Sequence, residues 1–486
     1  MRSTPPFLRV LPLVVLGILI GNAVEMEWWI GAAGAALSLL VALIIRRHRV
    51  AGIYVAAALV FGAISTTSLT APKVATSHAN IAADTLTVTS QPIHSAHNQR
   101  CEATLECDGT SRAILLTAPS SLPLSPGSRA IVRGRLSPLP ASSYGNLMAR
   151  RGFYASLRID SPTDWHPLTP TTSPTIAARK VQSRLLGRID SLHLPERESG
   201  VVKAMLLGWR GGIDPHLRDS YARAGASHIL AISGLHVGLV AMLVWWLCGL
   251  LPAVGRRGHI IRNIIASAIL LLYAVITGLS PSVVRATAMF CTAQMALTYG
   301  IGRHSLNTLC AAISLMLLFN PNNLFDISFL LSATAVAGIA IGYHPIHSRL
   351  TTKYHHPRFS EFVGLTVVAL CSTLATLPLV AYSFGVVSLV GLFINPVVIV
   401  CAEIVVLGGL IWISLPWDWL APLAHSLLAG AAELQNRVVE SAAQMSWSAI
   451  TTHTPLWLVI LCYTLVVLLL IVAHRTTKKR EWTLEK

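Results

Sequence analysis

The chain has 486 residues, of which 53% are hydrophobic and only 12% are charged, and its formal net charge is +16. Soluble domains carry about 25% charged residues, so this composition excludes an ordinary soluble globular protein. Several apolar runs reach the roughly 20 residues that cross a bilayer, which predicts a polytopic membrane protein. The positive excess fits basic cytoplasmic loops, and it also suits a polyanionic partner such as nucleic acid.

The first 69 residues predict three transmembrane helices. Apolar runs extend over about Val10–Val24, Trp28–Ile45 and Val50–Ser68. The basic run Arg46–Arg49 separates the second from the third and marks the cytoplasmic side. The N-terminus is therefore expected in the cytoplasm, and the chain leaves the third helix on the outside.

Residues 70–175 predict an extracytoplasmic, mostly β domain. Short alternating runs such as Thr85–Val88 and Arg129–Leu136 are typical of strands, and a domain of this length suits a small OB-like barrel. Its basic residues are either a solvated face or candidates for contacts with DNA. The candidates, which lie close in sequence, are Arg129, Arg133, Arg135, Arg150 and Arg151.

Two cysteines lie close together in this polar domain. Cys101 and Cys107 are six positions apart, and an extracytoplasmic domain allows disulfides. They are therefore a disulfide candidate.

The rest of the chain predicts a second membrane block. Residues 176–200 have the spacing of an amphipathic interfacial helix, residues 201–474 contain further apolar segments, and residues 475–486 form a basic cytoplasmic tail. The whole is expected to be a polytopic α-helical protein of about 10–12 spans, with both termini cytoplasmic. The stretch 386–454 breaks the pattern, and Asn395-Pro396 within it suggests a broken or re-entrant helix.

Polar residues cluster in the apolar run Ala226–Leu239. His228, Ser233 and His236 are costly at membrane depth and usually face a bundle interior or a water-filled path, and Gly234 permits close approach. On one continuous helix the two histidines would share roughly one face. They are hydrogen-bonded core residues or, less simply, part of a metal site.

A second polar group follows at Ser282 and Arg285. An arginine in a membrane span needs a partner, and its planar fork suits phosphate. The alternative is an intramembrane ion pair with Asp326. No phosphate-binding loop of the Walker type occurs, so an ATPase within this chain is not expected, and no motif calls for a metal or another cofactor.

Taken in order, these segments resemble the ComEC family of competence proteins. The strongest match is His228–Val237, which is similar to the hallmark of that family. The other matching segments are Arg151–Phe153, Leu206–Gly208, Thr277–Ala286, Asn320-Pro321, Leu324–Asp326, Phe329–Ser332, Ala375–Pro378, Phe384-Gly385 and Asn395-Pro396.

The resemblance implies a channel that brings single-stranded DNA through the cytoplasmic membrane during natural transformation, with the OB-like domain meeting DNA outside. Two departures matter. Many members continue into a metallo-β-lactamase-like domain, whereas this chain ends at Lys486 and is expected to be a short form without nuclease or other enzymatic activity. The family usually has Gln where Leu330 stands.

Residues expected to line the path come from the whole second block. They are His228, Ser233, Gly234, His236, Ser282, Arg285, Asp326 and Asn395. Expected partners are single-stranded DNA, membrane lipid, a DNA receptor, a cytoplasmic motor or helicase, and a second copy of the chain. Two alternatives stay open, namely a small-solute or ion transporter with a His/Arg/Asp relay and a membrane-embedded metal-dependent hydrolase using the two histidines.

Overall fold

A computed structural model describes most of the chain. The described residues are 6–24, 26–44, 48–95, 97–107, 109–230, 232–250, 255–298, 305–351, 357–415, 417–445 and 447–466. The basic tail predicted at 475–486 and the loop residues Arg46 and Arg47 lie outside them.

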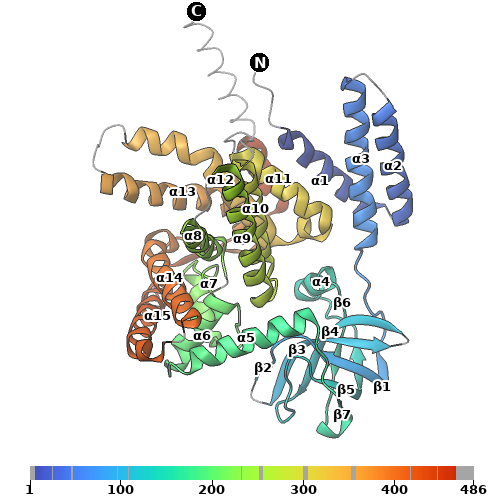
Figure 1. Cartoon of the computed structure of the whole chain (residues 1–486), viewed down its shortest axis with the longest axis vertical. Coiled ribbons are helices and arrows are strands. Elements are labelled where there is room, and N and C mark those ends of the chain that lie inside the picture. Colours follow the sequence, from blue (N-terminus) through green and yellow to red (C-terminus); the bar gives the residue numbers. More distant parts are fainter. Residues whose placement is uncertain are drawn as a thin grey trace, which may run out of the picture.

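Three apolar helices come first, as predicted. They are α1 (Phe7–Ala23), α2 (Trp28–Ile44) and α3 (His48–Leu69), and Figure 1 shows α2 and α3 side by side. Small residues allow this close packing, since a Cβ on Gly31 would meet the Ser65 backbone nitrogen at 2.8 Å. Helices that pack without a hydrophobic driving force rely on such close backbone contact.

A β-barrel follows. Its strands are β1 (Ala79–Val88), β2 (Ile93–His94), β3 (Asn98–Cys107), β4 (Thr110–Pro119), β5 (Arg129–Ser137), β6 (Phe153–Arg158) and β7 (Trp165–Leu168). The ring β1-β3-β4-β6-β5 closes because β5 also pairs with β1. Only the β4–β6 pairing within this ring is parallel. Both predicted strands are present, within β1 and β5.

The barrel interior is filled by alternate apolar side chains. In β3 the residues Cys101, Ala103 and Leu105 point inward while their neighbours face outward, as a period of two requires. The last ring strands are joined by the short helix α4 (Ser143–Arg150), which is capped by Ser142. In Figure 1, α4 lies on the side of the barrel that faces the helices.

Three shorter helices connect the barrel to the second block. They are α5 (Pro174–Asp190), α6 (Glu196–Leu207) and α7 (Pro215–Arg223). Helix α5 covers the first part of the amphipathic helix predicted over 176–200, but the chain leaves the helix after Asp190 and α6 begins at Glu196. Arg179 of α5 donates to the Gly278 carbonyl at 3.4 Å, while its own carbonyl accepts from Gln91 of the barrel domain. One residue of α5 therefore contacts both halves of the molecule.

The second block consists of helices of different lengths, most of them apolar. They are α8 (Gly234–Gly249), α9 (Gly255–Ile276), α10 (Pro281–Thr298), α11 (Ser305–Phe319), α12 (Ile327–Thr351), α13 (Pro357–Phe384), α14 (Gly391–Ser414), α15 (Ala421–Ala443) and a further helix, Leu456–Val466. The short helices are η1 (Pro162–Asp164), in the barrel domain, η2 (Pro321–Phe325) and η3 (Asp418–Leu420).

The prediction of a broken helix near Asn395 is wrong. A short strand, β8 (Val386–Ser388), pairs with β9 (Ala449–Thr451), and α14 then runs without interruption through Pro396. Pro396 is the sixth residue of α14, so its missing backbone N–H leaves the Leu392 carbonyl without an intrahelical donor, yet the helix continues through it. The amphipathic stretch predicted after it is α15.

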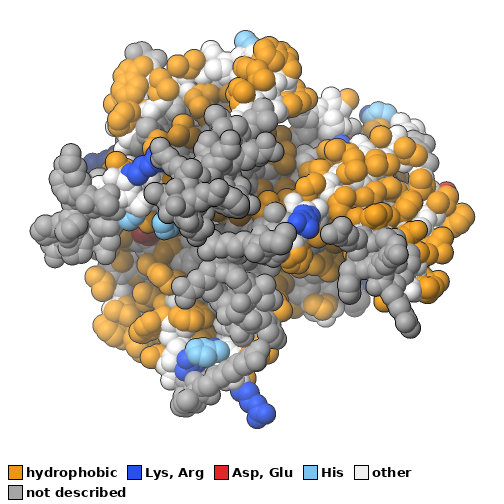
Figure 2. All heavy atoms as spheres, turned by 90° about the horizontal axis from the view of Figure 1, so that it is seen from above, with side chains coloured by type: hydrophobic (Ala, Val, Ile, Leu, Met, Phe, Trp, Pro, Cys, Tyr) orange, Lys and Arg blue, Asp and Glu red, His pale blue; other side chains and the backbone are white. Residues whose placement is uncertain are grey.

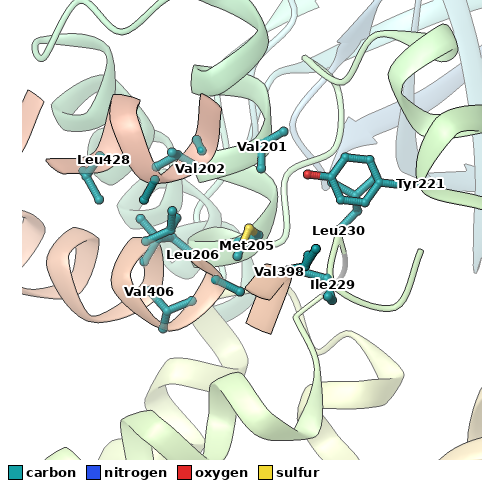
Figure 3. Close-up of a cluster of buried hydrophobic side chains, with 14 of the residues drawn as sticks. Val201, Val202, Met205, Leu206, Tyr221, Ile229, Leu230, Val398, Val406 and Leu428 are labelled. Carbon is teal, nitrogen blue, oxygen red and sulfur yellow. The ribbon is translucent and has the colours of Figure 1, made fainter. Parts of the chain in front are cut away.

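The largest buried cluster joins α6, α7, α14 and α15. Figure 3 labels Met205, Tyr221, Leu230 and Val406 among its members. Arg188 of α5 lies beside this cluster and contacts the end of α14. The Arg188 guanidinium donates to the Trp412 and Leu415 carbonyls at the end of α14 and lies over the Trp412 ring at 5.0 Å. Carbonyls at a helix C-terminus lack intrahelical partners, so a cation there stabilises the end of α14.

Apolar side chains also cover much of the outside. Leu43 is 85% exposed, Phe319 79% and Phe393 71%, and Figure 2 shows hydrophobic side chains spread over the face seen from above. Five described helices are long and apolar enough to cross a membrane, and five shorter apolar helices accompany them. The total of 10–12 spans stays a prediction.

Candidate functional site

The polar residues of the hallmark segment cap a helix. Ser233 is the N-cap of α8: its Oγ accepts from the His236 backbone N–H at 3.4 Å, while His236 Nδ1 accepts from the Ser233 N–H at 3.2 Å. This is a reciprocal capping box in which His replaces the usual Glu or Gln. His236 is 1% exposed. Because its Nδ1 is an acceptor, the neutral ring carries its proton on Nε2.

The prediction that His228 and His236 share one helix face is wrong. Helix α8 begins only at Gly234, and His228 lies in the preceding loop with an exposed side chain. Its neighbours Ile229 and Leu230 are buried in the cluster of Figure 3. The two rings are nevertheless close enough to interact electrostatically. The loop is thus anchored by its apolar residues, while His228 stays accessible.

The start of α8 lies against the start of α10. A Cβ on Gly234 would be 4.0 Å from the Ala286 Cβ, whereas Gly238, one turn further along, has open space beside it. Gly234 therefore brings the hallmark segment next to the residue that follows Arg285 in the chain. The structure unites these two predicted motifs.

Arg285 is the most unusual side chain of the site. It is 3% exposed, and its Nη2 donates to Ser282 Oγ at 3.0 Å, whereas Nε and Nη1 have no hydrogen-bond acceptor. A guanidinium has five N–H donors, and each buried donor left unpaired costs about 1–3 kcal/mol. The group lies over the Phe329 ring at 5.9 Å.

Arg285 forms no ion pair with Asp326, so the predicted intramembrane pair is absent. Asp326 precedes α12, and its Oδ1 accepts from the Ser328 backbone N–H at 2.8 Å. The two charges interact only at longer range. Asp326 is thus a helix-capping residue that moderates the positive potential at Arg285 without occupying its donors.

Asn395 lies on the other side of the hallmark loop. Its Oδ1 is buried without a partner, and a Cβ on neighbouring Gly391 would be 3.7 Å from Asn395 Nδ2 and 3.0 Å from the Ala224 carbonyl. Asn395 is therefore near the loop that follows α7, rather than part of the group around Arg285.

The five arginines predicted as DNA contacts in the barrel domain fall into two groups. Arg129, Arg133 and Arg135 occupy alternate, outward positions of β5, and Arg129 pairs with Glu106 at 3.1 Å. Arg150 and Arg151, at the end of α4, face the helices instead.

The contacts of α4 bring it to the membrane block. The Arg150 guanidinium lies 4.2 Å from the Phe325 ring centroid in η2, and desolvation there lowers the Arg150 pKa. Arg151 interacts electrostatically with both Arg285 and Arg210.

The predicted disulfide is incompatible with the fold. Cys101 and Cys107 lie on one continuous strand, opposite Leu116 and Thr110 respectively. Six residues of strand span about 20 Å, far beyond the roughly 4–7 Å between the Cα atoms of a disulfide, and the two are not bonded to each other. Burial and, less strongly, the Glu102 carboxylate raise the Cys101 pKa to about 12.

A buried polar network was missed. The Tyr221 hydroxyl donates to Asn436 Oδ1 at 2.8 Å and accepts from Gln435 Nε2 at 3.0 Å, and Asn436 donates to Glu198 at 3.5 Å. Tyr221 is therefore a core residue. The signal available in the sequence was the amide pair Gln435-Asn436 within the amphipathic helix.

Arg210, in the loop after α6, was also missed. Its only sequence signal is a charge two residues after Gly208, at the end of an apolar helix. For the metal-dependent alternative, the described part of the chain brings no three His, Cys, Asp or Glu side chains together in a metal-binding group. Nothing in this geometry favours a hydrolase.

The fold and site define a helical protein of membrane type, in which a β-barrel meets the polar starts of α8 and α10. A family model described as "Competence protein" matches residues 205–476, more than half of the chain. The chain belongs to this family, as the hallmark segment predicted.

Named relatives agree with this membership. ComE operon protein 3 of Bacillus subtilis is 27% identical over 284 residues, which cover 58% of this chain and 35% of that protein. Competence protein ComA of Neisseria gonorrhoeae is 28% identical over 234 residues, covering 46% and 30%. The uncharacterized protein YcaI of Escherichia coli is 25% identical over 169 residues, covering 34% and 22%. The matches thus span about a third or less of these relatives, and no solved structure matches the chain.

Proposed function

We propose that this protein carries single-stranded DNA across the cytoplasmic membrane during natural transformation. Membership of the competence family supports this, as do relatives named for competence and the series of apolar helices. The two termini are cytoplasmic and the barrel extracytoplasmic in this proposal, because the basic loops in the sequence mark the inner side.

The observation that carries the proposal is the meeting of three segments. The hallmark start of α8, the Ser282–Arg285 start of α10 and the arginine end of α4 lie together. A translocating strand needs a positive, accessible route whose contacts are weak enough to release it. Arg285 supplies fixed charge with unused donors, and exposed His228 and Gly234 keep the neighbouring surface open.

The barrel is the proposed first contact for DNA. Its ring order, with a single parallel pairing between the third and fifth strands of the ring in chain order, supports an OB-type barrel, an architecture that binds oligonucleotides. The outward arginines of β5 suit a phosphate backbone. In this scheme residues 1–69 anchor the barrel of residues 70–175, and residues 176–200 join it to the channel of residues 201–474.

Other components supply energy and delivery. The sequence holds no Walker-type phosphate-binding loop, so the proposed transport is driven by a partner such as a cytoplasmic motor or helicase, after a receptor presents the DNA. A second copy of the chain is a further proposed partner. The chain itself acts as a conduit and not as an enzyme.

Transformation frequency in a competent host tests the proposal. Deletion is expected to abolish uptake of homologous DNA and the intact gene to restore it, whereas His236→Ala and Arg285→Ala are expected to fail while still reaching the membrane. The control is Arg437→Gln, since Arg437 pairs only with Glu433 on the exposed side of α15.

His236→Gln separates the proposed role from the alternatives. Gln serves at the third position of a capping box, so this variant is expected to retain most transformation. A proton relay or a metal ligand would need the imidazole and would be lost. Undiminished transformation after deletion would overturn the proposal, and labelled-solute uptake would then test a transporter.

A further inference from the structure

Arg151 lies within electrostatic range of an arginine from each of two other segments, where the barrel meets the helices. Arg151 follows α4, Arg210 follows α6 and Arg285 lies in the first turn of α10, and Arg151 interacts electrostatically with each of the others. Two aromatic contacts fix this junction, because Arg150 stacks on Phe325 while Arg285 lies over Phe329. Like charges repel, so the arrangement is costly unless an anion joins it.

Apart from the bond from Arg285 Nη2 to Ser282, the three guanidinium groups make no hydrogen bond within the described residues. Arg285 keeps Nε and Nη1 buried and unpaired, and neither Arg151 nor Arg210 forms an ion pair within the described residues. Asp326 is the nearby acid, and its Oδ1 is committed to the N–H of Ser328. The site therefore holds more positive charge and more free N–H groups than its own acceptors satisfy.

Accessibility changes along the group. Arg151 and Arg210 are exposed, whereas Arg285 is buried. Although Arg210 is exposed, the protein around it and then the like charges of Arg218 and Arg151 lower its pKa. A chain of phosphates entering from the barrel would meet the exposed pair first and the buried guanidinium last.

We propose that Arg151, Arg210 and Arg285 form a phosphate-binding site that receives successive phosphates of one nucleic-acid strand between the barrel and the helices. The guanidinium fork suits this ligand because it can donate two parallel bonds to one phosphate. This inference rests on the proposed function and names the place where the strand leaves the barrel.

Salt-dependent binding to the full chain, in detergent or in nanodiscs of neutral lipid, tests the site. The probe is a fluorescein-labelled oligo-dT followed by anisotropy across a NaCl series. Each phosphate contact with a single strand contributes about 0.7 to the slope of log K against log salt. Arg151→Gln with Arg210→Gln should lower the slope by about 1.4, and adding Arg285→Gln by about 2 in total.

Two control variants test whether the loss of any exposed arginine charge lowers the slope, or only loss at the proposed site. Arg158→Gln removes an exposed barrel arginine that pairs with Asp160 at 2.8 Å, and Arg437→Gln removes one on α15. Both should leave the slope unchanged. Because Arg151 and Arg210 are exposed, their double variant is expected to fold normally even if Arg285→Gln does not, and lysine at both positions should restore most of the slope.

Three results would overturn the site. They are failure of the intact protein to bind oligo-dT, an unchanged slope in the triple variant, and an equal fall of the slope in the controls. If the triple variant lost binding to anionic-lipid vesicles but still bound oligo-dT like the intact protein, the site would likewise be overturned, in favour of a lipid headgroup. Competition by inorganic phosphate only at far higher concentration than oligo-dT would support a strand. The proposed function fails separately, through undiminished transformation after deletion.

Discussion

Replacing Arg285 with methionine should make the protein no less stable while abolishing transformation. The change removes one bond to Ser282, worth about 1–2 kcal/mol, and a distant aromatic contact worth about 0.5 kcal/mol. It also removes two buried, unpaired N–H donors, each costing about 1–3 kcal/mol. With each term at the middle of its range, the expected net effect is about 2 kcal/mol of added stability, and at the least favourable values it is close to zero, as when buried charges are replaced by apolar side chains of similar shape.

Arg188→Met is the matched comparison. Arg188 donates to the Trp412 and Leu415 carbonyls and stacks on the Trp412 ring. Its side chain is 28% exposed, so water replaces part of what is lost, and the expected cost is about 2–3 kcal/mol. Both variants replace an arginine with methionine, but Arg285 has buried donors without acceptors, whereas Arg188 donates to two carbonyls.

Thermal unfolding of purified protein in one detergent measures both effects. A difference of 1 kcal/mol shifts the Tm of a large domain by about 2–4 °C. The Tm of Arg188→Met should therefore fall by several degrees, while the Tm of Arg285→Met should stay unchanged or rise. An equal fall in both variants would refute the argument, because it would mean that Arg285 has structural partners. Wild-type transformation by Arg285→Met would equally refute its role.

Gly278→Ala should destabilise by more than 1 kcal/mol, because φ there is +88° and the new Cβ would lie 1.9 Å from a side-chain nitrogen. Gly187→Ala, with open space in mid-helix, should instead stabilise by about 1 kcal/mol, and thermal unfolding measures both. Cys101 should resist maleimide at neutral pH in the folded protein and react after denaturation, and a non-reducing gel should show no intramolecular bond to Cys107. Tyr221→Phe should lower the free energy of unfolding by about 1–2 kcal/mol, because two buried amides lose a partner. An unchanged Tm would show that this hydrogen-bond network does not stabilise the core.

The sequence predicted the helices well. The three N-terminal spans agree with α1–α3 to within a few residues, because long apolar runs in a bilayer have few other structures available. The two strand runs were also found correctly, since alternation at period two survives in a barrel with one buried face. Family membership followed from the hallmark residues, which lie close together in the chain.

Errors arose where the pattern was read as a regular helix. His228 was expected within a helix because its neighbours are apolar, yet those neighbours, Ile229 and Leu230, belong to the buried cluster that joins α6, α7, α14 and α15. The break expected at Pro396 is absent because α14 continues through the proline, and residues on both sides of it, Val390 and Val398, are buried in the largest cluster. The disulfide failed because nearness in sequence becomes separation along an extended strand.

The sequence by itself determined the membrane class, the approximate helices, the barrel strands and the family, because each depends on composition or on residues near one another in the chain. The tertiary structure alone decided that Arg151 lies within electrostatic range of Arg210 and of Arg285, that Asp326 caps a helix instead of pairing with Arg285, and that two Arg285 nitrogens remain without acceptors. Those facts depend on which distant elements pack together, and a local pattern carries no information about the partners that a buried charge will find.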